Sequence, residues 1–223
     1  MGLDEWIQRV FVDRGPGVAA LGPQQCGVRL PVGPSRDLLA VRYLTALFRE
    51  PALLLGGLSD DDVGRGLANL LEGDARSDVC ALACPDVPID ERRECVLAVT
   101  HLFCDYLGPK LAAMRARGEI TIGFAEILEV CSSWWEVWPL RYDESRGPAE
   151  LDRAALVVMA AQLRSGIEDC VESALKGLGY WQWEYETEVR SLLNEYLAAH
   201  TRLSFSVQFL LFEGFGLTGA PAR

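Results

Sequence analysis

An all-α fold is the structure that this sequence predicts most directly, and three observations lead to it. Apolar residues recur every three or four positions over most of the chain. No sustained alternation of period two is present, and Gly and Pro residues separate the apolar stretches at short intervals. Helical segments joined by tight turns indicate antiparallel neighbours. We therefore expect an array of antiparallel helical pairs, with an irregular helical bundle as the alternative.

The N-terminal half predicts helices separated by one long loop. Residues 14–34 contain four prolines and five glycines, so we expect a Gly/Pro-rich loop there. Ser35 can cap the helix that follows, and three aspartates after Ser59 fall in the first turn of another, where the helix dipole favours negative charge. Gly64 and Gly66 inside that helix indicate close packing or a weak helix. The helices expected here cover residues 3–12, 35–49, 59–73, 80–84 and 90–107.

The C-terminal half predicts shorter connections. Gly108-Pro109 ends the preceding helix, Pro139 stops another, and Pro148 occupies the first turn of the next. We expect helices over residues 109–117, 122–138, 148–164, 167–178, 184–200 and 202–213. From Glu150 onward the helix–turn–helix unit recurs at about 35–40 residues, close to the length of HEAT-like pairs. The sequence therefore predicts a HEAT-like α-solenoid over residues 1–223, as a single helical domain.

Composition and charge restrict the partners that the chain can bind. It has 21 basic and 32 acidic residues, a net charge of −11, which disfavours nucleic acid and anionic membranes and favours a basic protein. The longest apolar run, residues 154–161, is too short to cross a bilayer, and the N-terminus lacks a signal-type apolar core. Seven cysteines, several inside helical patterns, are typical of a reducing compartment. We expect a cytoplasmic protein.

Catalytic and metal-binding patterns are weak in this sequence. Cys80 and Cys84, followed by His101 and Cys104, form the best metal candidate, but their spacing is not that of a zinc knuckle, and core cysteines are the preferred interpretation. His200 ends a helix, where it suits the dipole. Phosphate loops, dinucleotide fingerprints and nucleophile elbows are absent from the sequence. We expect no cofactor and no catalysis, while a carboxylate pair such as Glu126 and Glu129 remains open.

Tryptophans and acidic residues supply the candidate binding surface. Trp135 and Trp138 have the helical spacing of core residues, whereas Trp181 and Trp183 lie in a predicted turn and are expected to be exposed anchors. The predicted partner-binding residues are Asp60, Asp61, Asp62, Glu126, Glu129, Glu136, Glu184, Glu186 and Glu188, with Trp181 and Trp183 as anchors.

The segment Glu172–Trp181, ESALKGLGYW, resembles a segment of a group of uncharacterised, all-helical bacterial proteins. The Trp134-Trp135 pair and Leu102-Phe103 resemble the same group, over about residues 36–200. Histidine is common in the group where this chain has Lys176 and Tyr180, so two potential ligands are missing here. The resemblance implies a relative of helical-repeat scaffolds and of immunity proteins that accompany secreted toxins.

Three hypotheses follow for function. The leading one is a non-catalytic immunity protein, whose acidic surface neutralises a basic bacterial toxin domain by direct binding. The second is a HEAT-like scaffold or adaptor that holds a peptide or domain on its concave surface. The third, least favoured, is a metal- or carboxylate-dependent enzyme. The oligomeric state is left open by the sequence.

Overall fold

The computed structural model describes residues 1–13, 35–71, 78–119, 126–140 and 148–217, and every regular element in these ranges is helical. The predicted all-α class is confirmed, and the Gly/Pro-rich loop at 14–34 lies outside the described residues. The elements are α1 (Leu3–Phe11), α2 (Arg36–Arg49), α3 (Pro51–Leu55), α4 (Asp60–Leu71), η1 (Asp78–Ala83), α5 (Ile89–His101), η2 (Leu102–Leu107), α6 (Gly108–Ala116), α7 (Glu126–Ser133), α8 (Ala149–Arg164), α9 (Glu168–Trp181), α10 (Glu186–Ala199) and α11 (Phe205–Phe215).

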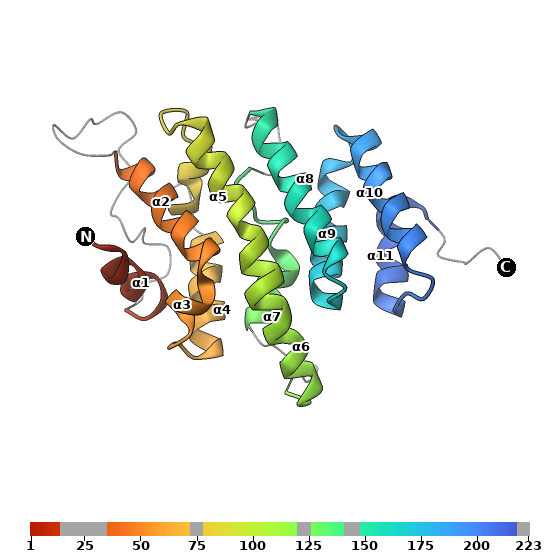
Figure 1. Cartoon of the computed structure of the whole chain (residues 1–223), viewed down its shortest axis with the longest axis horizontal. Helices are drawn as coiled ribbons and strands as arrows, with labels where there is room; N and C mark the ends of the chain where they lie inside the picture. Colours follow the sequence, from red (N-terminus) through yellow and green to blue (C-terminus); the bar gives the residue numbers. More distant parts are fainter. Residues whose placement is uncertain (14–34, 72–77, 120–125, 141–147, 218–223) are drawn as a thin grey trace.

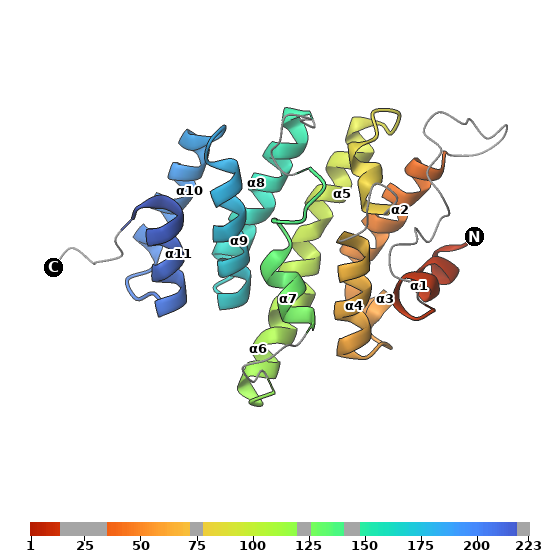
Figure 2. The same cartoon turned by 180° about the vertical axis from the view of Figure 1, so that it is seen from behind.

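The helices lie in two rows along the long axis of the molecule (Figures 1 and 2). One row consists of α2, α5 with its continuation α6, α8 and α10, each packed on the next. The other row consists of α4, α7, α9 and α11, again in sequence order, and α1 packs against α4 at the N-terminal end. Helices within a row run in the same direction, and the two rows run in opposite directions. All helices of the second row therefore begin at one edge of the molecule.

Local sequence signals account for several helix ends. The Ser35 hydroxyl accepts a bond from the Leu38 amide at the start of α2 (3.2 Å), as predicted, and Ser204 caps α11 through the Val207 amide. Gly216, with φ of +64°, adopts the left-handed conformation that ends α11. These caps satisfy amides and carbonyls that have no partner inside the helix.

The Gly108-Pro109 pair does not interrupt the chain as expected, because the helix continues through it. Residues 102–107 widen into a π-helical turn, and the Gly108 amide donates to the Phe103 carbonyl five residues back. Proline has no amide hydrogen, so this wider turn accommodates Pro109 without a lost bond inside a regular helix. Gly108 also packs closely: a Cβ there would lie 2.6 Å from the Cys170 Sγ. The prediction of a helix end at residue 107 was therefore wrong.

Four buried tryptophans form the centre of the core. The rings of Trp134 and Trp138 stack at 5.6 Å, and Trp135 meets both Trp138 and Trp181 edge to face. The predicted helix over 122–138 ends at Ser133, so Trp134, Trp135 and Trp138 follow α7 in a turn rather than extending it. The first residues of that predicted helix, 122–125, lie outside the described residues.

Glycines allow the closest helix contacts, as their positions inside helices predicted. A Cβ on Gly64 of α4 would lie 2.5 Å from the Ile127 backbone nitrogen of α7, and one on Gly66 would enter the Phe11 ring of α1. Gly177 of α9 meets the Trp135 ring in the same way, at 2.7 Å. Close packing, rather than a weak helix, is therefore the reason for Gly64 and Gly66.

Hydrogen bonds between buried polar side chains connect different elements of the fold. Asp78 accepts bonds from the Trp6 indole (2.7 Å) and from Arg36 (2.6 Å), which joins η1 to α1 and α2. The Tyr185 hydroxyl donates to Asp152 at 2.8 Å, and the Trp135 indole donates to Gln162 at 3.0 Å. Each bond satisfies a polar atom that would be costly to bury alone. None of the described helices has the length and apolar character needed to span a membrane.

Candidate protein-binding surface

The acidic residues of α4 and α7 gather at the edge where the second row of helices begins (Figure 2). Asp60, Asp61 and Asp62 occupy the first turn of α4, and Glu126 and Glu129 occupy the first turn of α7. The contact between Gly64 and the Glu126-Ile127 backbone holds the two helices together. We call these five residues the acidic edge. The structure therefore brings together two groups of acidic residues, Asp60 to Asp62 and Glu126 with Glu129, that are more than sixty positions apart in sequence.

Two cations partly neutralise the acidic edge. Lys110 of α6 lies 2.6 Å from Asp60, and Arg65 lies 2.6 Å from Asp62 and 3.9 Å from Glu126. Burial by itself lowers the pKa of Lys110, but its bonds to Asp60 and Tyr106 outweigh that effect, so the pKa is raised. Lys110 therefore stays charged. Among the described residues, Asp61 and Glu129 are exposed and form no ion pair, so this edge keeps exposed negative charge.

The remaining predicted binding residues lie elsewhere. Glu184 and Trp183 are in the turn between α9 and α10, and Glu186 and Glu188 are in the first turn of α10, at the edge opposite the acidic edge (Figure 1). The fourteen residues of α9 separate the two edges by about 21 Å. Glu136 follows α7 and is exposed. Apart from Glu136 and the buried Trp181, the predicted residues thus form two separate groups rather than one patch.

Only one of the two predicted aromatic anchors is exposed. Trp183 is 81% exposed, whereas Trp181 is completely buried against Trp135. The assignment of Trp181 as an exposed anchor was wrong, because α9 extends to Trp181 and directs its side chain into the core. Residues 181 and 183 had been expected in a turn, but the turn begins only after Trp181.

The four residues of the candidate metal site, Cys80, Cys84, His101 and Cys104, are not grouped as metal ligands in the structure. Cys80 and Cys84 belong to the η1 region, whereas His101 ends α5 and bonds through Nδ1 to Asp105 at 2.7 Å. Across the described parts of the chain, no three His, Cys, Asp or Glu side chains are placed to hold a metal ion. Cys104 is half-buried, and burial, with a smaller effect of Asp105, raises the pKa of its thiol. Cys84 and Cys104 are partly buried against the hydrophobic core, as expected of packing residues.

Buried thiols elsewhere are poor nucleophiles. Burial raises the pKa of Cys95 and of Cys170 to about 12, and raises that of Cys131 well above its ordinary value. The thiolate is the reactive form, so these side chains stay protonated at neutral pH.

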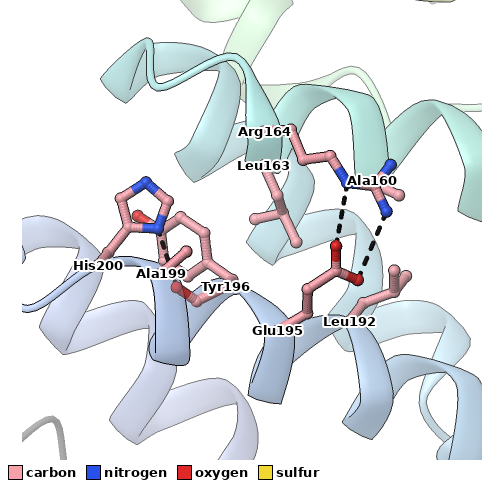
Figure 3. A pocket seen from close by; sticks show the side chains of 8 residues that line it. All are labelled: Ala160, Leu163, Arg164, Leu192, Glu195, Tyr196, Ala199 and His200. Atoms are coloured by element: carbon pink, nitrogen blue, oxygen red, sulfur yellow. Dashed lines mark hydrogen bonds and ion pairs between the residues drawn. The ribbon is translucent and has the colours of Figure 1, made fainter.

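A small hollow lies between α8 and α10 (Figure 3). His200 caps α10, bonding the Tyr196 carbonyl at 2.9 Å while its ring stacks on the Tyr196 ring at 4.3 Å. Arg164 and Glu195 form an exposed ion pair beside them. The hollow measures about 50 Å³, and a second one, between α10 and the end of α11, about 140 Å³. Ligand pockets usually reach about 300–1,000 Å³, so neither hollow suits a substrate of ordinary size. Glu126 and Glu129, the carboxylate pair considered above, line neither hollow.

No protein-family model, curated protein or solved structure matches this chain.

One exposed feature of α11 was not predicted from the sequence. Phe205, Phe209 and Phe212 of α11 are 84%, 53% and 54% exposed, although they belong to an apolar helix. Their spacing of four and three residues places them on one side of α11, opposite the buried Val207 and Leu211. A helix with two apolar sides was visible in the sequence, but only packing decides which side is covered.

Proposed function

We propose that this chain is a non-catalytic protein-binding protein, built as a HEAT-like array of helical pairs, that binds a basic protein through its acidic edge. The observation that carries the proposal is the grouping of Asp60, Asp61, Asp62, Glu126 and Glu129 at the first turns of two packed helices. Rigid helices hold these carboxylates in place, so less conformational entropy is lost when a partner binds. Complementary charge speeds association and disfavours acidic competitors.

Neutralisation of a cognate bacterial toxin is the specific form of this proposal. A toxin domain with a basic surface, such as one that acts on nucleic acid, would meet complementary charge at the acidic edge. The resemblance of residues 172–181 to a helical bacterial group, which implies a relative of helical-repeat scaffolds and of immunity proteins, is compatible with this form of the proposal and with an adaptor. The free cysteines found among the described residues suit a cytoplasmic location, where thiols stay reduced.

Charge reversal tests the acidic edge. The variant Asp61→Lys/Glu126→Lys/Glu129→Lys changes three exposed side chains, and Asp4→Lys/Glu5→Lys/Asp13→Lys makes the same change in net charge near α1. Proteins captured by each variant and by the native chain are compared by quantitative mass spectrometry. The proposal expects a basic partner that is lost with the first variant, retained with the second, and bound more weakly as salt rises. Equal capture by all three chains would refute it.

A toxicity assay separates the immunity hypothesis from the adaptor hypothesis. A captured basic partner is expressed in a host cell with either the native chain or the acidic-edge variant. If the chain is an immunity protein, only the native chain restores growth. A scaffold would instead return several unrelated partners and protect against none of them.

A further inference from the structure

Helix α11 has a second apolar side that no described element covers. Val207 and Leu211 are buried, and the main contact of α11 is with α9. Phe205, Phe209 and Phe212 form an exposed stripe on the other side, which we call the phenylalanine stripe. Single exposed apolar residues are common on protein surfaces, but three large rings in line on one helix mark an interaction surface.

Charge indicates what this surface binds. The chain has a net charge of −11, so two copies repel each other over most of their surface. The segment from Phe205 to Phe212 contains no charged residue, and Glu213 is the single charged residue of α11. A second copy can therefore approach the phenylalanine stripe without meeting like charge. An anionic membrane, by contrast, would be repelled by the rest of the chain.

The order of residues along the stripe is self-complementary. An antiparallel pair of α11 helices related by a two-fold axis places Phe205 opposite Phe212 of the second copy, and the two Phe209 rings beside the axis. Arg202 is exposed three residues before α11, and Glu213 lies near its end. Because the pairing is antiparallel, Arg202 of one copy and Glu213 of the other belong to the same end of the interface.

We propose that the phenylalanine stripe is an isologous dimer interface, in which two copies of this chain pack α11 against α11 in antiparallel orientation. The exposed parts of the three rings amount to about 380 Å² per copy, taking about 200 Å² for each whole ring. Two copies would bury about 760 Å² through these rings alone, below the roughly 1,200 Å² of a standard interface. Flanking residues add to this area, so the dimer is small and dissociates on dilution.

Sedimentation equilibrium over a wide range of concentration tests the proposal. The native chain shifts from its monomer mass of 24.6 kDa toward twice that value as concentration rises. Phe209→Glu places two like charges at the axis and remains monomeric. Val157→Glu, made at an exposed apolar residue of α8 with similar exposure, still dimerises. Circular dichroism establishes that both variants keep their helical content. A native chain that stays monomeric throughout, or a dimer that Phe209→Glu leaves intact, overturns the proposal.

Cross-linking and charge exchange test the antiparallel register. Phe209→Cys brings two thiols together at the axis and forms a reducible dimer on mild oxidation, whereas Val157→Cys does not. Arg202→Glu weakens the dimer, and adding Glu213→Arg restores it, because opposite charges are again present at the same end of the interface. Absence of the Phe209→Cys cross-link, or absence of rescue, overturns this register.

Two further measurements separate this surface from other occupants and from the proposed function. If the native chain floats with anionic or zwitterionic vesicles and Phe209→Glu does not, the stripe binds lipid and the dimer proposal is overturned. The charge-reversal variant Asp61→Lys/Glu126→Lys/Glu129→Lys lies at another part of the molecule and is expected to dimerise normally. The test of dimerisation is therefore independent of the test of binding at the acidic edge.

Discussion

Two glycines in α9 provide a matched test of how tightly the tryptophan core is packed. Gly177 and Gly179 lie in the same helix two residues apart, and neither has positive φ. A Cβ added at Gly179 meets nothing within 4 Å, whereas one added at Gly177 lies 2.7 Å from the Trp135 Cγ and 3.0 Å from the Met159 sulfur. Replacing either glycine with alanine brings a similar gain in helix propensity. The difference between the two variants therefore isolates the steric cost at Trp135.

The magnitudes follow from that geometry. Gly179→Ala is expected to stabilise the protein by up to about 1 kcal/mol, the propensity difference between Gly and Ala inside a helix. Gly177→Ala gains a similar amount but incurs an overpacking cost of about 1–3 kcal/mol. The cost is expected at the upper end, because the Trp135 ring cannot move freely: its indole bonds Gln162 at 3.0 Å, and its ring packs against Trp138 and Trp181. Gly177→Ala is therefore destabilising by about 0–2 kcal/mol net of that propensity gain.

Urea and thermal unfolding followed by far-ultraviolet circular dichroism measure both variants. For a chain of this size, 1 kcal/mol corresponds to roughly 2–4 °C in Tm, so the two variants should move in opposite directions from the native protein. Tryptophan fluorescence provides a second readout, since only Gly177→Ala perturbs the indole cluster. If Gly177→Ala proved as stable as Gly179→Ala, the packing of α9 on Trp135 described above would be wrong.

Three further predictions concern other parts of the molecule. Asp78→Ala should destabilise the protein by about 1–3 kcal/mol, because it leaves the buried Trp6 indole without its acceptor and removes one carboxylate partner of Arg36, which keeps its ion pair with Asp37; chemical denaturation measures this. Hydrogen bonds from serine hydroxyls, chiefly that of Ser204 and also that of Ser206, lower the pKa of Glu168 in the folded protein. Glu168 therefore contributes stability that is complete above its ordinary pKa and is lost as pH falls through the lowered value, which a pH series of native and Glu168→Gln unfolding should show. Cys131 and Cys170 should resist alkylation at neutral pH until the protein unfolds, as peptide mass spectrometry can establish.

Controls accompany each of these predictions. Glu5→Ala removes an exposed ion pair with Arg9 and should cost less than about 1 kcal/mol, so an equal loss from Asp78→Ala would contradict the buried bond. Acid stability that is unchanged by Glu168→Gln would refute the link between α9 and α11. Modification of Cys131 as fast as that of the half-buried Cys104 would show that the core opens readily.

Helical periodicity was sufficient to predict most helices, because each helix forms bonds within its own segment. The Ser35 and Ser204 hydroxyls accept the amide hydrogen bonds that begin their helices, and Gly64 and Gly66 indicated either close packing or a weak helix, of which the structure shows close packing. The sequence pattern predicted the wrong helix end where tertiary packing outweighed the local preference of Gly and Pro. Gly108-Pro109 normally breaks a helix, but burial of Leu102, Phe103, Tyr106 and Leu107 favours a π-turn over a break.

The candidate surfaces were only partly predictable. The charges at Asp60 to Asp62 and at Glu126 could be identified as surface residues, but nothing local says that α4 and α7 pack together. The sequence also could not distinguish Trp181 from Trp183, since one residue of helix length determines which indole enters the core.

By itself, the sequence determined the all-α class, the net charge of −11 and most helix boundaries, since these depend on composition and on contacts within a few residues. Only the tertiary structure decided which groups became neighbours: the acidic edge from α4 and α7, the tryptophan cluster, and the exposed side of α11. The physical reason is that burial of an apolar helix side is favourable both in the protein core and in an interface with a partner. Only the packing of the other helices determines which of these it meets.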